Sequence, residues 1–413
     1  MKINSINKLG ITLLFLNAFV YISNCFYTPF LSSYYSKAGL RAVEIGILLT
    51  IGPVVAILIQ PIWAVISDKT GRRKDVLSLV VIGSGLSMFS YYIGKSFFTF
   101  FLATLLLSVF STSILPLSDA ITLRNAHKYQ LDFAKIRLGG TLGFAIVVIL
   151  AGAIVRVNPE LQFIMGFFGY MMLLLLTRKL PEDEIEEIGK KDRIGHFKIK
   201  QKTVHKPFRI SLPGLFHIFE SKQIYFMLAF AFINQVGLSF NGSFVGVYLI
   251  KLGLTEGEVG IMNSICAISE IPVLFLINRI LNKISTMKLT ILSCLILGLR
   301  IFIVTGGNVQ SIVAAQALNG LTYMIMYFSC AVFISKNVKQ ENQSKGQSIL
   351  AIIQTGIGSI VGNIVGGYFV DCFGLNSAYR YMAFLILAVS GLILLIQVIY
   401  HKSVKTNKLS CTN

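Results

Sequence analysis

Charged residues are scarce in this sequence. Asp, Glu, Lys and Arg make up 13% of its 413 residues, against about a quarter in a typical soluble domain. Hydrophobic residues make up 54%, and they gather in long runs such as 9–35, 45–67, 76–93 and 97–117. Each run is near the roughly 20 residues that a helix needs to cross a bilayer. The sequence therefore predicts an all-α protein that crosses a membrane many times.

Residue patterns that catalysis or metal binding would need are missing. The six Cys show no C-x-x-C or other ligand spacing. No nucleophile and base form a recognisable set, and no G-x-x-x-x-G-K-[ST] phosphate loop is present. We therefore expect no enzyme activity, no metal, no cofactor and no ATP-driven pumping.

Lys and Arg are unevenly distributed between the two sets of loops that the spans define. The loops on one side hold most of the 37 Lys and Arg, and the 178–222 stretch is the richest. The loops on the other side hold only Lys37, Arg41, Lys95, Arg156 and Lys251. Basic loops stay in the cytoplasm, so both termini are expected there, in a plasma membrane of the bacterial inner-membrane kind. The net charge of +19 is then a topology signal and not a sign of nucleic-acid binding.

The apolar runs predict twelve spans in two groups of six. The spans are 9–35, 43–67, 75–93, 97–120, 135–155, 160–178, 222–250, 257–280, 287–305, 309–334, 345–371 and 376–400. We expect an N-terminal bundle (1–178), a cytoplasmic linker (179–221) and a C-terminal bundle with a short tail (222–413).

The two groups of spans share a short sequence repeat. The segment "LRAVEIGIL" (40–48) resembles "LTEGEVGIM" (254–262), and each opens the second span of its group. A duplicated helical unit is typical of secondary transporters, whose solute site lies near the midplane between the repeats.

A dense mixed-charge segment, "WAVISDKTGRRKD" (63–75), follows the second span. It resembles the loop between helices 2 and 3 of the major facilitator superfamily, G-x-L-a-D-R-x-G-R-[RK], with matches at Asp68, Gly71, Arg72 and Arg73. The resemblance implies the major facilitator fold of two pseudo-symmetric six-helix bundles. It also implies that these four residues act as a conformational latch. The alternative is a basic loop that only sets topology.

Among the charged residues inside predicted spans four stand out, one acid and one base in each half: Asp119, Arg137, Glu270 and Arg300. A charge is costly inside a membrane and usually faces a cavity or a partner. Pairing within each half would offset the cost of desolvation. The alternative is that both pairs only hold helices together.

Neutral polar residues recur at helical spacing in the first, fourth, seventh and tenth spans. The stripes are Asn17, Tyr21, Asn24 and Thr28; Ser108, Thr112 and Asp119; Asn234, Asn241 and Tyr248; Gln316, Asn319, Tyr323 and Tyr327. In the major facilitator fold these four helices line the cavity, so the stripes favour a water-filled central site. The candidate solute contacts among them are Asn24, Asn241, Asn319 and Tyr323. Interhelical hydrogen bonding is the other interpretation.

Three further segments carry a sharper resemblance. "PLSDAITL…YQLDFAKIRLGGTLGFAI", "SEIPVLFLINRI" and "ALNGLTYMI" look like the phenylpropionate/oligosaccharide/nucleoside-proton symporter branch, which includes lactose permease relatives. The resemblance implies that Asp119 and Arg137 bind substrate, and that Glu270 and Arg300 take part in proton coupling. That branch commonly has a His where this chain has Asn319. An amide cannot titrate, so proton coupling would depend on Glu270 or Asp119.

Together these patterns predict a monomeric, proton-coupled importer of a small organic solute such as a sugar, a nucleoside or an aromatic acid. The sequence leaves open a drug or metabolite exporter and a uniporter without proton coupling. A membrane sensor or scaffold is the alternative without transport. The sequence does not identify the solute.

Overall fold

The computed structural model describes residues 3–181 and 221–410. The predicted linker (179–221) therefore lies almost wholly outside the described residues. The N-terminal half contains α1 (Ile3–Cys25), α2 (Leu31–Lys37), α3 (Ala42–Thr70), α4 (Arg73–Ser87), α5 (Phe97–Ser111), α6 (Ile114–Lys128), α7 (Phe133–Val157) and α8 (Leu161–Arg178). A 3₁₀ turn, Met88–Tyr92, extends α4.

The C-terminal half is built in the same way, with more interruptions. It contains α10 (Lys222–Lys251), α11 (Glu256–Lys283), α12 (Thr286–Val304), α13 (Val309–Ala317), α14 (Asn319–Thr322), α15 (Met324–Asn337), α16 (Gln343–Ala351), a π-helical turn (Ile352–Gly358), α17 (Ser359–Phe373) and α18 (Leu375–Ser410). A short 3₁₀ turn, Gln340–Asn342, precedes α16.

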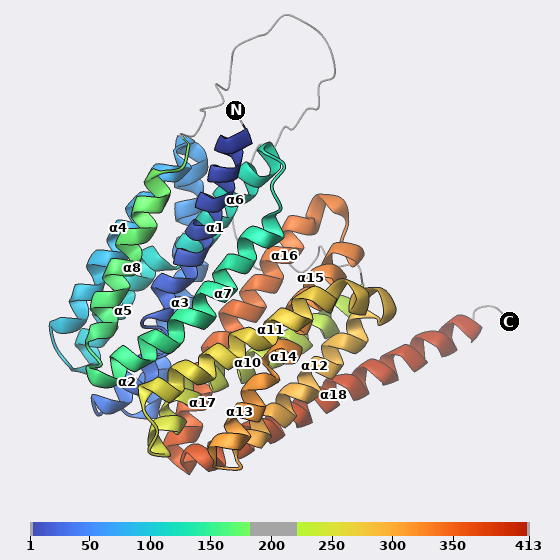
Figure 1. The fold of residues 1–413 in the computed structure, drawn as a ribbon. Coiled ribbons are helices and arrows are strands. Elements are labelled where there is room, and N and C mark those ends of the chain that lie inside the picture. Colours follow the sequence, from blue (N-terminus) through green and yellow to red (C-terminus); the bar gives the residue numbers. More distant parts are fainter. Residues whose placement is uncertain (1–2, 182–220, 411–413) are drawn as a thin grey trace, which may run out of the picture.

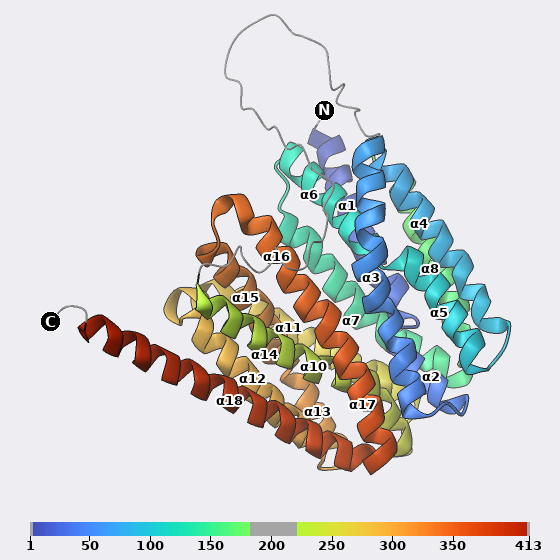
Figure 2. The ribbon, with the colours of Figure 1, turned by 180° about the vertical axis from the view of Figure 1, so that it is seen from behind.

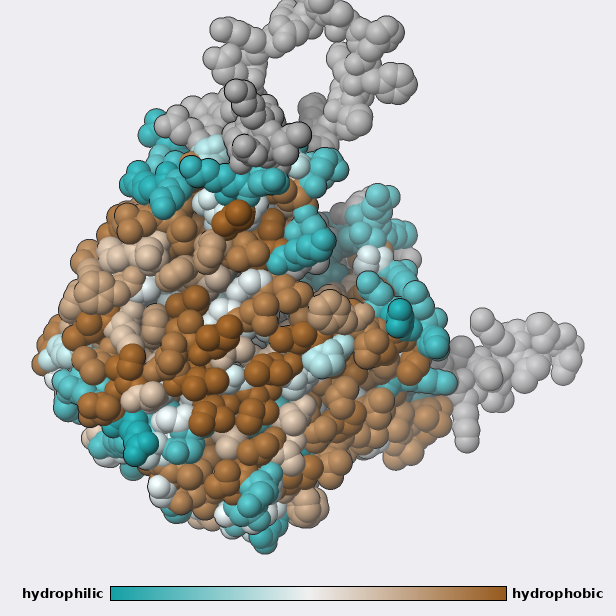
Figure 3. All heavy atoms as spheres, in the orientation of Figure 1, coloured by the Kyte–Doolittle hydropathy of each residue, from teal (hydrophilic) through white to brown (hydrophobic). Residues whose placement is uncertain are grey.

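The described helices match the predicted membrane protein. Eleven are long and apolar enough to cross a bilayer, or twelve when the bent pair Val309–Ala317 and Asn319–Asn337 counts as one span. Large apolar side chains on the outer surface are exposed, and Figure 3 shows them as a broad hydrophobic band between hydrophilic ends. The predicted fold class, twelve helices in two bundles, is confirmed.

The first predicted span, 9–35, is divided in the structure. The helix α1 ends at Cys25, and a turn leads to the short α2. Pro29 lies in that turn, and a proline disfavours a helical conformation in the residue before it. The interruption redirects the chain towards the C-terminal half, which α2 contacts through α10.

The fourth predicted span, 97–120, is longer than expected and bent. It runs through α5 and α6 as far as Lys128, with a break at residues 112–113. Pro116 has no N–H to donate to the carbonyl oxygen of Thr112, and the side-chain Nε2 of Gln60 donates to that oxygen at 2.9 Å instead. The break places Asp119 inside α6 and not at a helix end.

The two halves meet where the sequence repeat predicts symmetry. Gly46 in α3 and Gly260 in α11 occupy equivalent positions of the repeat. A side chain on Gly46 would collide with the backbone of Asn363 in α17, and a Cβ on Gly260 would lie 2.5 Å from the carbonyl oxygen of Val148 in α7. Both glycines thus allow a helix of one half to cross a helix of the other closely.

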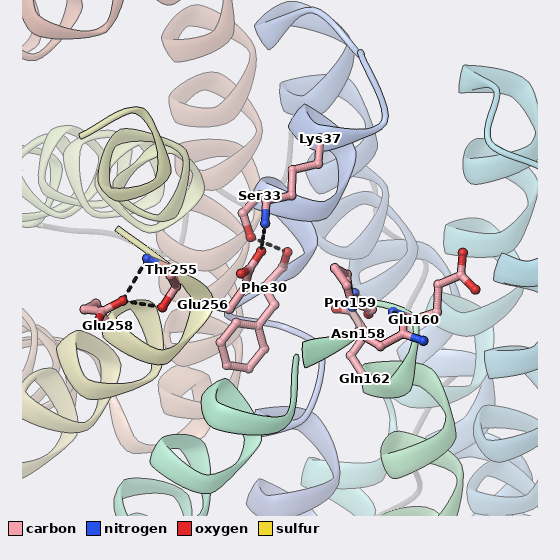
Figure 4. A network of polar contacts seen from close by, with 10 residues as sticks. All are labelled: Phe30, Ser33, Lys37, Asn158, Pro159, Glu160, Gln162, Thr255, Glu256 and Glu258. Carbon is pink, nitrogen blue, oxygen red and sulfur yellow. Dashed lines mark hydrogen bonds and ion pairs between the residues drawn. The ribbon is translucent and has the colours of Figure 1, made fainter. Parts of the chain in front are cut away.

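Polar contacts join the halves at the end where α2 and α17 lie. Lys37 Nζ lies 2.5 Å from Glu256 Oε1, and the Glu256 side chain is almost fully buried. Figure 4 shows the two side chains pointing towards each other across the seam. The carboxylate of Asp371 accepts hydrogen bonds from the backbone N–H groups of Ala42 and Val43, at 2.9 and 3.0 Å. From this closed end the two bundles diverge, as Figures 1 and 2 show.

Candidate functional site

A polar cavity of about 200 Å³ lies in the C-terminal half, between α10, α11, α12 and the segments α13 to α15. Its polar lining is dominated by side-chain amides, from Gln235, Asn241, Asn263, Gln316 and Asn319. Each carboxamide can both donate and accept hydrogen bonds. The predicted residues Asn241, Asn319 and Tyr323 therefore all face one cavity.

Asn241 leaves an acceptor free at this cavity. Its side chain is 4% exposed, and its Oδ1 atom has no protein hydrogen-bond partner. A buried polar atom normally has a partner. The unused acceptor is covered in this conformation, so a polar solute would reach it only after the surrounding side chains move.

Arg300 is buried at the base of the cavity, with 1% of its surface exposed. One terminal nitrogen donates to Asn319 Oδ1 at 2.7 Å and to Thr322 Oγ1 at 2.9 Å. The other donates to Gln316 Oε1 at 2.6 Å and to the Cys266 sulfur at 3.5 Å. Neutral acceptors thus hold this guanidinium. Cys266 and Thr322 belong to the site although the sequence did not single them out, and Gln316 was predicted only as part of a polar stripe.

Glu270 is connected to Arg300 through an amide. Asn319 Nδ2 donates to Glu270 Oε1 at 2.9 Å, while Asn319 Oδ1 accepts from Arg300. The described ion pairs include none between Glu270 and Arg300. The expected direct pairing is therefore wrong in this structure, because neutral oxygens occupy the guanidinium and Asn319 lies between the two charges.

The N-terminal half holds its two charges in direct contact. Arg137 Nη1 lies 3.2 Å from Asp119 Oδ2, and both side chains are partly exposed. The second carboxylate oxygen, Asp119 Oδ1, is buried and has no protein partner. The ring of Tyr21 packs over Gly140 beside this pair. This half therefore presents an incompletely satisfied carboxylate.

The N-terminal pair lies close to the C-terminal cavity. Arg137 is an electrostatic neighbour of Tyr323 and Tyr327 as well as of Asp119. Tyr21 has Glu270 among its electrostatic neighbours. The structure therefore places Tyr21 and Arg137 of the N-terminal half near Glu270, Tyr323 and Tyr327 of the C-terminal half.

Asn24, a predicted solute contact, makes its hydrogen bonds within the N-terminal half. Its Nδ2 donates to the backbone carbonyl of Val20 at 2.8 Å. Its Oδ1 accepts from the hydroxyls of Tyr27 at 2.8 Å and Tyr170 at 3.5 Å. This geometry favours the alternative interpretation, in which Asn24 joins α1 to α8.

The predicted latch residues are engaged locally in this conformation. Gly71 ends α3 in the left-handed region, with φ 66°, which glycine adopts without strain. Arg72 precedes the first residue of α4. Asp68 forms an ion pair with Arg73 at 3.4 Å, with 59% of the Asp68 side chain exposed. The segment lies at the opposite end of α3 from the closed seam, about 40 Å away along a helix of that length.

Two six-helix bundles that are joined at one end, with a polar cavity in the C-terminal bundle, are typical of a membrane transporter. The chain belongs to the family described as MFS_1 like, whose model matches residues 8–381. It is thus a multi-pass membrane transporter of small solutes and not an enzyme.

Several proteins similar to this chain are named as transporters or permeases. The chain is 25% identical to the uncharacterized transporter YwbF of Bacillus subtilis, over 89% of this chain and 88% of that one. It is 24% identical to the maltose permease of Geobacillus stearothermophilus, over 89% of each chain. A crystal structure of a mutant of the nucleoside transporter NupG matches with a TM-score of 0.82 at 18% identity, over 94% of this chain and 99% of that one. The last likeness shows the shared fold.

Proposed function

We propose that the protein is a proton-coupled importer of an uncharged polar solute, of the sugar or nucleoside class. The observation that carries this proposal is the amide-lined cavity in which Asn319 connects Arg300 to Glu270. The side chains that line the cavity would then both bind the solute and contact Glu270, the acid that exchanges the proton.

The uncharged character of the solute follows from the hydrogen bonds around Arg300. Four neutral groups take up the hydrogens of its terminal nitrogens, so only the Nε–H, which has no protein partner, remains. A single donor cannot hold a carboxylate or phosphate in the bidentate way that arginine favours. Side-chain amides, in contrast, match hydroxyl groups and the edges of bases. Permeases for maltose and raffinose and the nucleoside permease NupG of Escherichia coli are among the relatives, which supports this class.

Glu270 is the proposed proton-exchanging group. It lies near the middle of α11, between Ser269 and Ile271, whereas Glu256 and Glu258 lie in the first turn of that helix. Intramembrane carboxyl groups act as proton carriers in transporters. Asn319 cannot take up a proton. Its hydrogen bond to Glu270 would therefore change when Glu270 gains or loses a proton, while the amide itself stays neutral.

Uptake into proteoliposomes tests the proposed function. Radiolabelled maltose, sucrose, uridine and phenylpropionate are supplied with and without an imposed proton gradient, acidic outside. We expect the gradient to drive accumulation of a sugar or of uridine, and not of the aromatic acid. Accumulation of phenylpropionate alone would contradict the uncharged class, and gradient-independent equilibration would indicate a uniporter.

We further propose that the protein lies in the plasma membrane as a monomer, with both termini and the 68–75 loop in the cytoplasm. The distribution of Lys and Arg supports this orientation. A cysteine introduced in place of Asp75, on a background without other cysteines, should resist an impermeant maleimide added to intact cells. Labelling from outside would reverse the orientation.

A further inference from the structure

The tenth span is broken beside the cavity, in a stretch without proline. The helix α13 ends at Ala317, the single turn α14 covers Asn319–Thr322, and α15 begins at Met324. The segments before and after Leu318 differ in direction by 43°. Sharp bends in helices have identifiable causes, and here the cause lies in the neighbouring helices.

Two serines of neighbouring helices bind the backbone of the break. Ser269 Oγ, on α11, accepts from the N–H of Gly320 at 3.0 Å. Ser293 Oγ, on α12, donates to the carbonyl oxygens of Leu321 and Thr322, at 3.2 and 2.8 Å. Broken helices persist at membrane depth only where such partners satisfy the freed groups.

The close approach of α14 to α11 also depends on Gly320. A Cβ at this position would lie 2.8 Å from the carbonyl carbon of Ser269, where no real side chain fits. The break is therefore seated directly on the turn of α11 that precedes Glu270.

The same neighbours bind the side chains on both sides of the break. Arg300 donates to Gln316, which precedes the break, and to Asn319 and Thr322, which follow it. Asn319 in turn donates to Glu270. Its place between the two charges thus depends on where the helix is interrupted.

We propose that Ser269 and Ser293 are positioning residues of the solute site: they hold the interrupted tenth span in the one geometry that presents Asn319 to Arg300, Glu270 and the cavity together. This inference rests on the proposed function, because it takes the cavity as the solute site. Without either hydroxyl, the freed backbone groups lose their partners and the segment shifts towards a continuous helix. Only the fraction of molecules that keep the break would then bind solute, which raises the apparent dissociation constant.

The transport test compares Ser269→Ala, Ser293→Ala and Ser269→Thr in proteoliposomes, with radiolabelled maltose and uridine as probes. We expect each alanine variant to raise KM about tenfold, the effect of leaving a buried backbone group without a partner, with a smaller change in turnover. Ser269→Thr keeps the hydroxyl and should stay within about twofold of the unchanged protein.

Ser84→Ala is the matched control. Ser84 is fully buried in α4, and its hydroxyl bonds only within its own helix, to Val80 O at 2.7 Å. We expect no change in KM. An equal rise in KM for Ser84→Ala, or an unchanged KM for both Ser269→Ala and Ser293→Ala, would overturn the proposal.

A second readout does not depend on the solute. The Cys266 thiol lies 3.2 Å from Gln316 Oε1 and 3.5 Å from Arg300 Nη2, so loosening of the break should expose it. Mass spectrometry of the peptide that holds Cys266 measures its alkylation by N-ethylmaleimide. We expect the alkylation rate to be several-fold higher in Ser269→Ala and Ser293→Ala than in the unchanged protein. Equal alkylation rates would overturn the proposal, whether or not maltose or uridine is transported. Absence of transport of both probes would count against the proposed solute class and not against the role of the two serines.

Discussion

Each half of the molecule has one acidic residue and one arginine in its candidate site, and the two halves connect these residues differently. In the N-terminal half, Arg137 contacts Asp119 directly, and both side chains are partly exposed. In the C-terminal half, Arg300 is buried among neutral acceptors and reaches Glu270 only through Asn319. The pseudo-symmetric fold therefore supports two different electrostatic arrangements.

The difference indicates a division of labour. A direct, partly hydrated pair can exchange its partner for a solute at little cost, since solvent already screens it. A buried charge that depends on several neutral groups is part of the structure around it, and disturbing one member affects the others. We infer that the N-terminal pair contributes to solute binding, whereas the C-terminal set both lines the solute cavity and transmits the state of Glu270.

The largest expected effect separates the two arginines. Arg300→Ala should lower the free energy of unfolding by about 3–5 kcal/mol, because it leaves several buried acceptors without a donor. Arg137→Ala should cost about 1 kcal/mol or less, because its pair is partly exposed. Thermal denaturation in detergent measures both. Equal losses of unfolding free energy in the two variants would show that the two arginines do not differ in their contribution to stability.

A double-mutant cycle tests the bridge formed by Asn319. The effects of Asn319→Ala and Glu270→Gln on the maltose or uridine KM should be non-additive by about 0.5–3 kcal/mol, as for residues in one hydrogen-bond network. The cycle of Asn319→Ala with Asp119→Asn should be additive to within about 0.5 kcal/mol. Strong coupling in the second cycle would show that the two halves act as one network.

Asp119→Asn should weaken solute binding and preserve coupling. The Oδ1 atom of Asp119 is buried and has no protein partner, so it would accept a hydrogen bond from the solute in a conformation that uncovers it. A hydrogen bond to a charged group contributes about 1.5–3 kcal/mol. We therefore expect KM to rise about tenfold or more while the proton gradient still drives accumulation. Loss of accumulation at saturating solute would assign the coupling role to Asp119.

The smallest effect on stability is expected at the charged loop. Asp68 is largely exposed and pairs with Arg73 nearby in the chain, so Asp68→Asn should leave the melting temperature unchanged. If the loop latches the opposite conformation, the variant should nonetheless slow transport. Unchanged uptake rates would reduce the segment to a topology signal.

The fold was predictable from the sequence to a large extent, because apolar runs, basic loops and the repeat around Gly46 and Gly260 are periodic signals. The interruptions were not. Pro29 and Pro116 offered local cues to two of them, but the break at Leu318 depends on Ser269 and Ser293, which come from other helices. Such tertiary hydrogen bonds leave no pattern in the sequence of the span itself.

The candidate site was predictable as a set of residue types and not as a set of contacts. The stripe that contains Gln316, Asn319 and Tyr323 correctly marked the side of the tenth span that lines the cavity. The expected pairing of Glu270 with Arg300 was wrong, since charge complementarity alone cannot reveal an amide between two ions. Cys266 gave no signal, because a cysteine in an apolar helix resembles any small core residue.

We propose that Glu270 carries the coupling proton in the C-terminal half. Proteoliposomes with Glu270→Gln are compared with the unchanged protein for two activities, counterflow exchange of the transported sugar or nucleoside and its accumulation under an imposed proton gradient. We expect exchange to persist, because the amide preserves the hydrogen bond to Asn319, and gradient-driven accumulation to be lost. Accumulation by Glu270→Gln at the level of the unchanged protein would show that Glu270 does not carry the coupling proton.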